Sequence, residues 1–456
     1  MPKEKLESLM NNYNNSVDMI REKWLLFFQN NNHLLIEPHS LLPKDDPSLL
    51  WINSGVAALK KYFNNPELSP SKNLVNCQRV IRTNDLDRID GNSYHQTLFE
   101  MLGCFSIGGS FKQEIIPLIW EFFTNHDWLG IDSKRLFITV LEEDKETFEI
   151  WRNQPNIFLE NLILAPRSSN FWDMGDGPCG PNTEIYYCFE NFTPDYALTI
   201  DDLESKKFIE IINIVFSEFY HSGSEYLPLS KKCVDIGGGL ERIALVMQEV
   251  KSTFEIDLWK NSIQWLEHCL KINKINLTSE DRWKIYVIAD HLRTAIFAIS
   301  DGALPEHKKR GYVLKKLLKR SALLSYIFNI SLDDIKILYK NIISSNGAFY
   351  KDLISNEDYI LSVIENEFIK FNQSFDIAFK KINRFLENDF QPEISADTIF
   401  FWYDTEGIPL ELINFSLSKR EKFFNKEKFD ELLFNQKERS LLERKKQGIS
   451  TFKKTK

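Results

Sequence analysis

The stretch Cys233-Val-Asp-Ile-Gly-Gly-Gly-Leu-Glu-Arg-Ile-Ala-Leu-Val constrains the fold of this chain more than any other. It begins with the apolar character of a short strand, and residues 240–247 continue with the apolar spacing of a helix. The three glycines between them allow another backbone or a ligand to approach closely. Such a strand, turn and helix can hold the carboxylate of Asp235 and the guanidinium of Arg242 at the floor of one site.

Two other interpretations of the glycine run are open. A dinucleotide-binding turn needs the spacing G-x-G-x-x-G inside a βαβ unit, and this segment has neither the spacing nor the unit. A purely structural turn needs no ligand. Asp235 and Arg242 weigh against the structural turn, because three upstream segments also carry residue types suited to phosphate, amine and adenine.

A hairpin upstream offers groups suited to a nucleotide. Residues 75–82 are predicted to form a strand, and residues 95–105 return as a second strand after a polar loop at residues 83–94. The hairpin presents Arg82 from one strand and Phe99 from the other. An arginine that clamps a phosphate beside a ring that stacks on a base is what nucleotide activation needs. Taken alone, the segment fits a surface arginine and a core phenylalanine better.

Residues 170–187 combine a Gly/Pro-rich loop with a strand that follows it. A rigid loop of this kind favours the wall of a small-molecule pocket over a simple connection. Trp172 and Asp176 are its candidate pocket residues.

Residues 208–219 are predicted to form a buried, β-branched strand, and Glu210 and Asn213 interrupt its apolar run. A polar side chain in a buried strand needs a hydrogen-bonding partner. A ligand is one candidate for that partner.

Length and charge bound the remaining possibilities. A chain of 456 residues can bury a full core in two or three domains. With a net charge of −9, it would meet a nucleic acid only through a local basic face. Its six cysteines form no C-x-x-C pair, which indicates reduced thiols in a soluble, cytoplasmic protein and no structural zinc site. No apolar run is long enough to span a membrane.

Taken together, these segments resemble the alanyl-tRNA synthetases, a family of class II aminoacyl-tRNA synthetases. The resemblance covers residues 17–412 in the family's order, and the combination of motifs is highly specific. Besides Arg82 and its hairpin, it rests on Leu98-Phe-Glu-Met-Leu-Gly-Cys-Phe-Ser, Asn170-Phe-Trp-Asp-Met-Gly-Asp-Gly-Pro-Cys-Gly-Pro, Glu210-Ile-Ile-Asn-Ile-Val-Phe, Val234-Asp-Ile-Gly-Gly-Gly-Leu-Glu-Arg-Ile, Ile288-Ala-Asp-His-Leu-Arg, Asp301-Gly-Ala-Leu-Pro, Arg310-Gly-Tyr-Val-Leu-Lys-Lys and Tyr403-Asp-Thr-Glu-Gly-Ile-Pro-Leu-Glu-Leu.

The resemblance implies an α+β fold. Residues 1–250 would form the catalytic domain, an antiparallel β-sheet flanked by helices, and residues 251–456 an all-α domain that recognises tRNA. Three roles are implied for catalytic residues: Arg82 on the α-phosphate of ATP, Arg242 on the γ-phosphate and Asp235 on the alanine ammonium. The other implied site residues are Phe99, Glu100, Gly237 and Gly239 for ATP, with Phe99 stacked on adenine, and Trp172 and Asn213 for alanine.

The implied reaction is attack of the alanine carboxylate on the α-phosphorus of ATP, helped by Mg²⁺, and then transfer of alanine from the adenylate to tRNA(Ala). No covalent enzyme intermediate is required, so the protein would act by positioning and electrostatics. The implied partners are therefore alanine, ATP and tRNA(Ala). A second class of function stays open, a non-catalytic relative that binds tRNA or a small molecule; retention of Arg82, Asp235 and Arg242 together favours the ligase.

A basic helix is predicted at residues 308–320, and a solvated face is the usual explanation of such a run of charge. Here the acidic remainder of the chain and the resemblance favour contact with tRNA phosphates. The implied tRNA-binding residues are His307, Lys308, Arg310, Lys315, Lys316, Arg320 and Asp404.

The chain departs from the family's pattern at several positions. The loop after Arg82 lacks a Gly-Gly-Lys-His stretch, Asn182 stands where the family usually has cysteine, and the turn at residues 175–177 lacks a common threonine. His307 replaces the asparagine that, with the aspartate matched by Asp404, reads a G·U pair in the acceptor stem of tRNA.

In the family, an editing domain with a zinc site and a C-terminal domain that supports dimerisation usually follow the segments matched here. This chain ends at Lys456 and its eight histidines include no H-x-x-x-H pair, so we also expect a zinc-free, monomeric enzyme without an editing centre.

Overall fold

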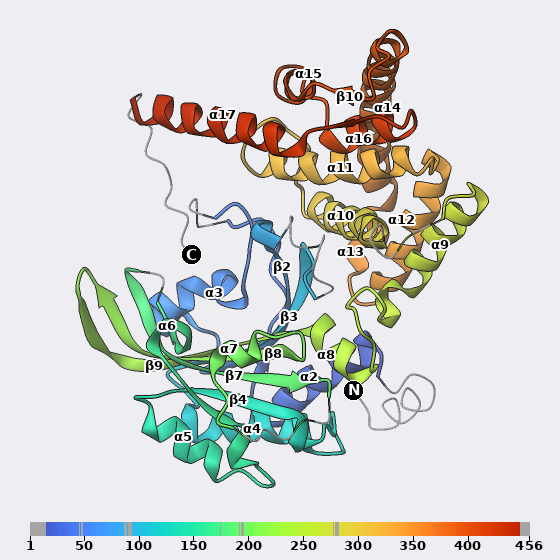
Figure 1. Ribbon diagram of the computed structural model, residues 1–456. Coiled ribbons are helices and arrows are strands. Elements are labelled where there is room, and N and C mark those ends of the chain that lie inside the picture. Colours follow the sequence, from blue (N-terminus) through green and yellow to red (C-terminus); the bar gives the residue numbers. More distant parts are fainter. Residues whose placement is uncertain are drawn as a thin grey trace.

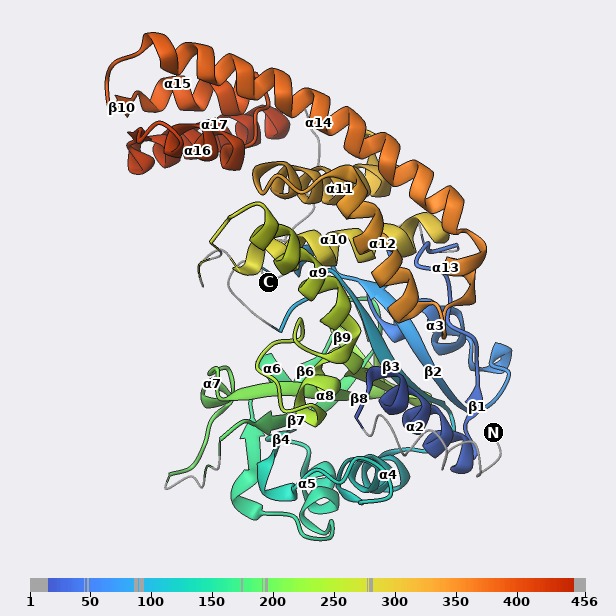
Figure 2. The same ribbon diagram turned by 90° about the vertical axis from the view of Figure 1, so that its right-hand side faces the viewer.

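The computed structural model describes residues 15–446, apart from 45, 47–48, 86–88, 90–93, 174, 191, 193–195, 277 and 279–281. Much of the polar loop predicted at residues 83–94 therefore lies outside the described residues. Figures 1 and 2 show two parts, a sheet with its helices and a group of helices packed beside it.

The main sheet is mixed and mostly antiparallel, with strand order β1-β2-β3-β9-β8-β7-β4-β5, and a short strand, β6, pairs with β7. Two pairings are parallel, β1 with β2 and β4 with β5. The strands are β1 (Leu34–Leu35), β2 (Asn73–Ile81), β3 (Leu98–Ile107), β4 (Leu136–Leu141), β5 (Leu162–Ala165), β6 (Phe171–Trp172), β7 (Gly177–Cys188), β8 (Phe208–Ser222) and β9 (Glu225–Gly239).

Seven helices accompany the sheet in the described part of the first 250 residues. Helix α2 is capped at its start, where the Ser16 hydroxyl accepts a hydrogen bond from the backbone N–H of Met19 and satisfies one of the free donors of the first turn. The helices are α2 (Val17–Asn30), α3 (Gly55–Asn64), α4 (Lys112–Thr124), α5 (Lys145–Arg152), α6 (Arg167–Asn170), α7 (Ile200–Leu203) and α8 (Leu240–Met247).

Helices α2 and α3 lie on opposite faces of β3. On one face, Arg21 of α2 donates two hydrogen bonds of 2.8 Å to Glu100. On the other, Gly55 at the start of α3 packs so closely on Phe105 that a Cβ there would lie 2.8 Å from the ring. Because successive side chains of a strand point to opposite faces, Glu100 and Phe105 mark the two sides of the sheet.

After α8 the described chain is helical except for one small pair of parallel strands, β10 (Glu393–Ile394) and β11 (Phe423–Phe424). Figure 2 shows α14 as the long helix that crosses this part of the molecule. The helices are α9 (Lys260–Ile272), α10 (Arg282–Ser300), α11 (Lys309–Ile327), α12 (Leu332–Asn346), α13 (Lys351–Ser355), α14 (Glu357–Asn388), α15 (Ala396–Phe400), α16 (Leu410–Ser418) and α17 (Lys426–Lys446).

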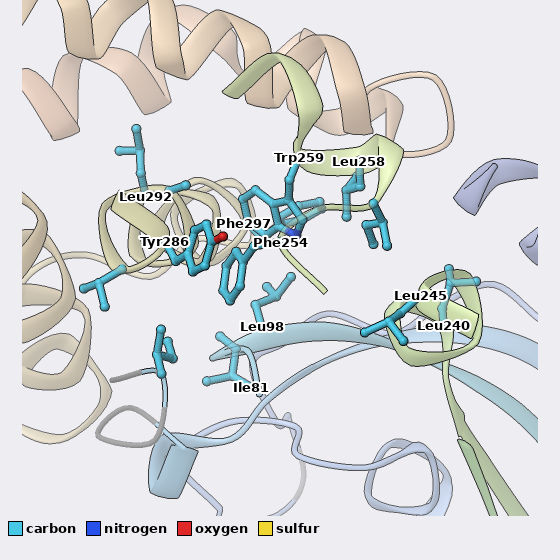
Figure 3. Close-up of a cluster of buried hydrophobic side chains, with 14 of the residues drawn as sticks. Ile81, Leu98, Leu240, Leu245, Phe254, Leu258, Trp259, Tyr286, Leu292 and Phe297 are labelled. Atoms are coloured by element: carbon cyan, nitrogen blue, oxygen red, sulfur yellow. The ribbon is translucent and has the colours of Figure 1, made fainter. Parts of the chain in front are cut away.

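Buried aromatic side chains join the helical part to the sheet (Figure 3). Phe254 stacks on Tyr286 of α10 with ring centroids 4.6 Å apart, and Leu98 of β3 and Leu240 of α8 belong to the same hydrophobic cluster. Burial of this apolar surface stabilises the contact between the two parts. The two parts thus share one core, and the predicted domain boundary at residue 250 stays a prediction.

The strand and the helix predicted around the glycine run are confirmed, but the turn between them is not, because Gly237, Gly238 and Gly239 are the last residues of β9 and α8 follows directly at Leu240. The hairpin of β2 and β3 is also confirmed as an antiparallel pair. A second prediction is also wrong: the Gly/Pro-rich stretch that follows Trp172 is not all loop, since strand β7 already begins at Gly177. Both prolines of that strand, Pro178 and Pro181, lie near its start.

Each of the six cysteines is a buried thiol outside any disulfide. Within the residues that the structure describes, helices that combine the length and the apolar character needed to cross a bilayer do not occur.

Candidate active site

Strand register gathers the predicted site residues on one face of the sheet. Asn213 of β8 lies opposite Gly237 of β9, and Val215 lies opposite Asp235. Phe99 of β3 lies opposite Val80 of β2, two residues before Arg82. Since alternate residues share a face, side chains from four strands converge above the centre of the sheet.

A cavity of about 340 Å³ lies over this face. The start of α3 and the residues before β3 form its sides. Every residue predicted for alanine or ATP lines this cavity except Glu100: they are Arg82, Phe99, Trp172, Asn213, Asp235, Gly237, Gly239 and Arg242.

Asp235 contributes a carboxylate to the cavity with no hydrogen-bond or ion-pair partner among the described residues. Burial raises its pKa to about 7, because the charged form loses the solvation of water. A cationic ligand would supply the missing counter-charge and return the carboxylate to its ionised form. The arrangement therefore suits an amine.

Glu210 and Asn213, the two polar residues that interrupt the apolar run of β8, are hydrogen-bonded to other side chains of the protein. Arg242 Nη1 donates to the carbonyl oxygen of Glu210 at 2.9 Å and to its Oε2 at 3.2 Å. Asn213 Nδ2 donates to Oε1 of Glu184 at 2.7 Å. Burial, and next the charge of Glu210, raise the pKa of Glu184 to about 8. Two carboxylates and one guanidinium thus stand together at the same end of the cavity.

Arg82 and Phe99 lie side by side at the mouth of the cavity. The guanidinium carbon of Arg82 is 5.1 Å from the centroid of the Phe99 ring, within the range of a cation–π contact. Arg82 Nε also donates to the carbonyl oxygen of Asn53 at 3.3 Å. The hairpin therefore places a guanidinium and an aromatic face where one nucleotide could reach both.

Two expectations about site residues are corrected by the geometry. Glu100 follows Phe99 on β3 and so points to the opposite face, where its side chain is fully buried against Arg21. Asp176, a candidate pocket residue, accepts a hydrogen bond from the backbone N–H of Gly223 at 3.1 Å and does not line the cavity.

The residues predicted to contact tRNA lie on the helical part. His307 and Lys308 are exposed just before α11, and Lys315 Nζ lies 3.4 Å from His307 Nε2. Arg320 is half-buried, with its guanidinium carbon 5.7 Å from the centroid of the Trp283 ring. Along α11, Arg310 is half-buried and Lys316 exposed, and Asp404 lies exposed on a π-helical turn at Phe401–Thr405.

Glu184 is one of the cavity residues that sequence reasoning missed. It sits on β7, directly opposite Asn213. The available signal was a charged residue in an apolar strand, the same signal that singled out Glu210. Among the described residues, no group of three or more histidine, cysteine, aspartate or glutamate side chains could hold a metal ion.

Comparison with known proteins agrees with this fold. The family model described as tRNA synthetases class II (A) matches residues 19–456, and the chain belongs to that family. Similar curated proteins include alanine–tRNA ligases of several bacteria. That of Mesoplasma florum is 38% identical over 443 residues, which is 93% of this chain and 49% of the relative.

The corresponding proteins of Malacoplasma penetrans and Ureaplasma parvum are each 40% identical. The aligned segments cover 86% of this chain and 43% of the relative for the first, and 91% and 47% for the second. The chain therefore spans about half the length of the curated relatives that it matches.

Proposed function

We propose that this chain activates alanine with ATP to form alanyl-adenylate and then transfers alanine to the 3′ end of tRNA(Ala). One observation carries the proposal: Asp235 brings a half-buried carboxylate without a partner among the described residues into a small cavity that also holds Arg82, Phe99 and Arg242. A non-catalytic relative that only binds tRNA would need none of these groups. The names of the relatives agree with this assignment.

In the proposed complex Asp235 holds the alanine ammonium through a charge-assisted hydrogen bond. Oδ1 of Asn213 is buried and has no hydrogen-bond partner among the described residues, so it can accept a second N–H of the same ammonium. Trp172 and Val215 line the same cavity and offer apolar surface to the methyl group. These contacts orient the alanine carboxylate toward the nucleotide.

For ATP, Phe99 is proposed to stack on adenine and Arg82 to hold the α-phosphate. Arg242 would hold the γ-phosphate. A guanidinium suits phosphate because its planar donors match two oxygen acceptors at once. Gly237 and Gly239 have no side chains, which leaves room above the floor of the cavity.

Class II synthetases in general use Mg²⁺ with ATP. Glu184 and Glu210 fit such an ion, because a divalent cation would relieve the repulsion that helps raise the pKa of Glu184. Mg²⁺ in nucleotide sites is commonly held by one or two carboxylates together with phosphate oxygens. When bound, the ion neutralises charge on those phosphates.

Both steps are displacements that move charge between oxygens. In the first, a carboxylate oxygen of alanine attacks the α-phosphorus and pyrophosphate leaves. In the second, a ribose hydroxyl of the terminal tRNA nucleotide attacks the activated carbonyl, AMP leaves, and the hydroxyl proton passes to the phosphate of the departing AMP. Arg82 stabilises charge on the α-phosphate in both steps and Arg242 stabilises charge on the departing pyrophosphate in the first, so this chain contributes position and electrostatics.

The basic helix α11 is proposed to contact the phosphates of the acceptor stem. Lys308, Lys309 and Lys316 are exposed, as expected of groups that track a phosphate backbone. The test of the whole proposal is charging of a tRNA(Ala) transcript with labelled alanine by the purified chain, with ATP and Mg²⁺. Charging with alanine supports the proposal, and charging with another amino acid alone overturns it.

A further inference from the structure

Arg293 of α10 is a buried cation that no step of the proposed reaction uses. Its side chain is 1% exposed. Its hydrogen bonds reach four acceptors on three elements: Asn346 Oδ1 of α12 at 3.2 Å, Glu241 Oε1 of α8 at 3.1 Å, and two on β3, the Leu98 carbonyl oxygen at 3.1 Å and Glu100 Oε1 at 3.4 Å. One guanidinium therefore ties the helical part of the chain to β3 and α8.

The two carboxylates bound by Arg293 depend on cations, because a buried charge is costly unless it is paired. Burial acts to raise the pKa of Glu100, but Arg21 and then Arg293 outweigh it and lower that pKa to about 2. Burial raises the pKa of Glu241 to about 7, and Arg293 acts in the opposite direction. Glu100 also accepts from the Tyr350 hydroxyl at 2.7 Å.

The groups that this network holds are backbone neighbours of the proposed ATP contacts. Glu241 accepts a hydrogen bond from the backbone N–H of Glu100 at 3.0 Å, and Arg293 donates a hydrogen bond to the carbonyl oxygen of Leu98. The peptide on each side of Phe99 is thereby fixed. Glu241 itself directly precedes Arg242 on α8. The same network therefore holds both Phe99, the proposed adenine contact, and Arg242, the proposed γ-phosphate contact.

We propose that Arg293 is a positioning residue for ATP, through which the helical part of the chain sets the geometry of Phe99 and Arg242. This inference rests on the proposed function for the roles of those two residues. It assigns the helical part a role in the nucleotide site in addition to contact with tRNA. Alanine should be affected far less, since no hydrogen bond of Arg293 reaches β8 or β9, which carry Asn213 and Asp235.

The test compares two conservative variants with the wild-type chain. Arg293→Lys keeps the charge, but an ammonium has three donors on a flexible stem and cannot reproduce the planar fork. Glu241→Gln keeps an acceptor for the Glu100 N–H and loses the ion pair. The matched control is Arg420→Lys, an exposed arginine of the helical part that is paired with Glu387 at 2.9 Å.

Calorimetric titration gives the Kd of ATP without alanine and the Kd of alanine without ATP, well below the unfolding temperature of each variant. Arg293→Lys is expected to raise the Kd of ATP about tenfold, and that of alanine less than about twofold. The control should leave both unchanged. If Arg293→Lys does not fold, Glu241→Gln is judged by the same criteria.

An unchanged Kd of ATP in a folded variant overturns the inference, and so does an equal loss of affinity for ATP and alanine, which would mark a purely structural role. A wild-type chain that binds no ATP overturns both this inference and the proposed function. A wild-type chain that binds ATP but activates a different amino acid overturns only the proposed function, and the Kd of ATP still decides the role of Arg293.

Discussion

Asn213 donates a 2.7 Å hydrogen bond from Nδ2 to Oε1 of Glu184 across neighbouring strands. This bond fixes the amide, so that its carbonyl oxygen is left without a partner among the described residues. The same cavity contains the carboxylate of Asp235. One unpaired acceptor and one unpaired carboxylate together match the several N–H donors of an ammonium group better than they match a neutral ligand.

Asp235→Asn is expected to reduce alanine activation strongly and to leave the fold intact. The variant keeps the shape of the side chain but removes the charge that faces the ammonium, which should cost about 2 to 4 kcal/mol of binding in the activated complex. The measurement is kcat/KM for alanine in pyrophosphate exchange, with a thermal melt as the control for folding. Wild-type exchange kinetics in the folded variant would show that Asp235 does not bind alanine.

The pKa of Asp235, about 7 in the free protein, predicts a pH dependence of alanine binding. The ammonium pairs only with the ionised carboxylate, so the KM for alanine should rise about tenfold for each pH unit below 7. A flat KM between pH 5.5 and 8 would contradict this.

The same group should make the free protein less stable as the pH rises from about 4 to 7. The folded state holds the proton of Asp235 in that window and the unfolded state does not, so the free energy of unfolding falls as the pH rises. Asp235→Asn removes this contribution. Denaturation of both proteins at pH 5 and pH 8 measures the difference.

Arg242→Ala should mainly weaken the use of ATP. Arg242 is the proposed γ-phosphate contact, and its ion pair with Glu210 at 3.2 Å already points it along the cavity. We expect the KM for ATP to rise by about tenfold or more, with the KM for alanine little altered. Arg152→Ala on α5, an exposed arginine outside the cavity, is the control. A rise confined to the KM for alanine would reverse the assignment.

Gly180→Ala should destabilise the fold. A Cβ at Gly180 would lie 1.9 Å from the carbonyl oxygen of Phe216, a backbone atom that cannot move without disturbing β8. Overpacking of this kind costs about 1 to 3 kcal/mol or more. In the matched variant Gly238→Ala, the added Cβ would lie no closer than 3.4 Å to any atom. Its free energy of unfolding should be within about 1 kcal/mol of that of the wild type. Similar stabilities for both alanine variants would refute the prediction.

Discrimination of a G·U pair in the acceptor stem should be weak or moved to another position. An imidazole at His307 offers one donor and one acceptor, without the paired geometry of the asparagine amide that it replaces. Charging of a G·U and a G·C acceptor stem side by side, by the wild type and by His307→Asn, measures this. A very large preference of the wild type for G·U would show that His307 does not limit recognition.

Much of the fold and most of the candidate site could be predicted from the sequence, because polar residues in apolar strands are local signals. Asp235 and Asn213 stood out in this way, and the register of β8 with β9 then brought them together. Arg242 stood out as a charged residue in the apolar run that forms α8. Glu184 carried the same signal and was missed. Strand alternation alone could have excluded Glu100, since its neighbour Phe99 was already assigned to the site face.

The role of Arg293 could not be predicted from the sequence. Its acceptors on Leu98, Glu241 and Asn346 lie 195, 52 and 53 residues away along the chain. No periodicity within one helix reports partners at such separations. The strand that begins at Gly177 could not be predicted for a different reason. Gly and Pro are typical of loops, and only the pairing with β8 makes these residues part of a sheet.

Exchange of labelled pyrophosphate into ATP by the purified wild-type chain tests the central claim most directly, because it requires the proposed adenylate and no tRNA. We predict exchange that depends on alanine and Mg²⁺ and that is lost in Asp235→Asn. Exchange without an amino acid, exchange only with an amino acid other than alanine, or no exchange by a folded chain that binds ATP would contradict the account.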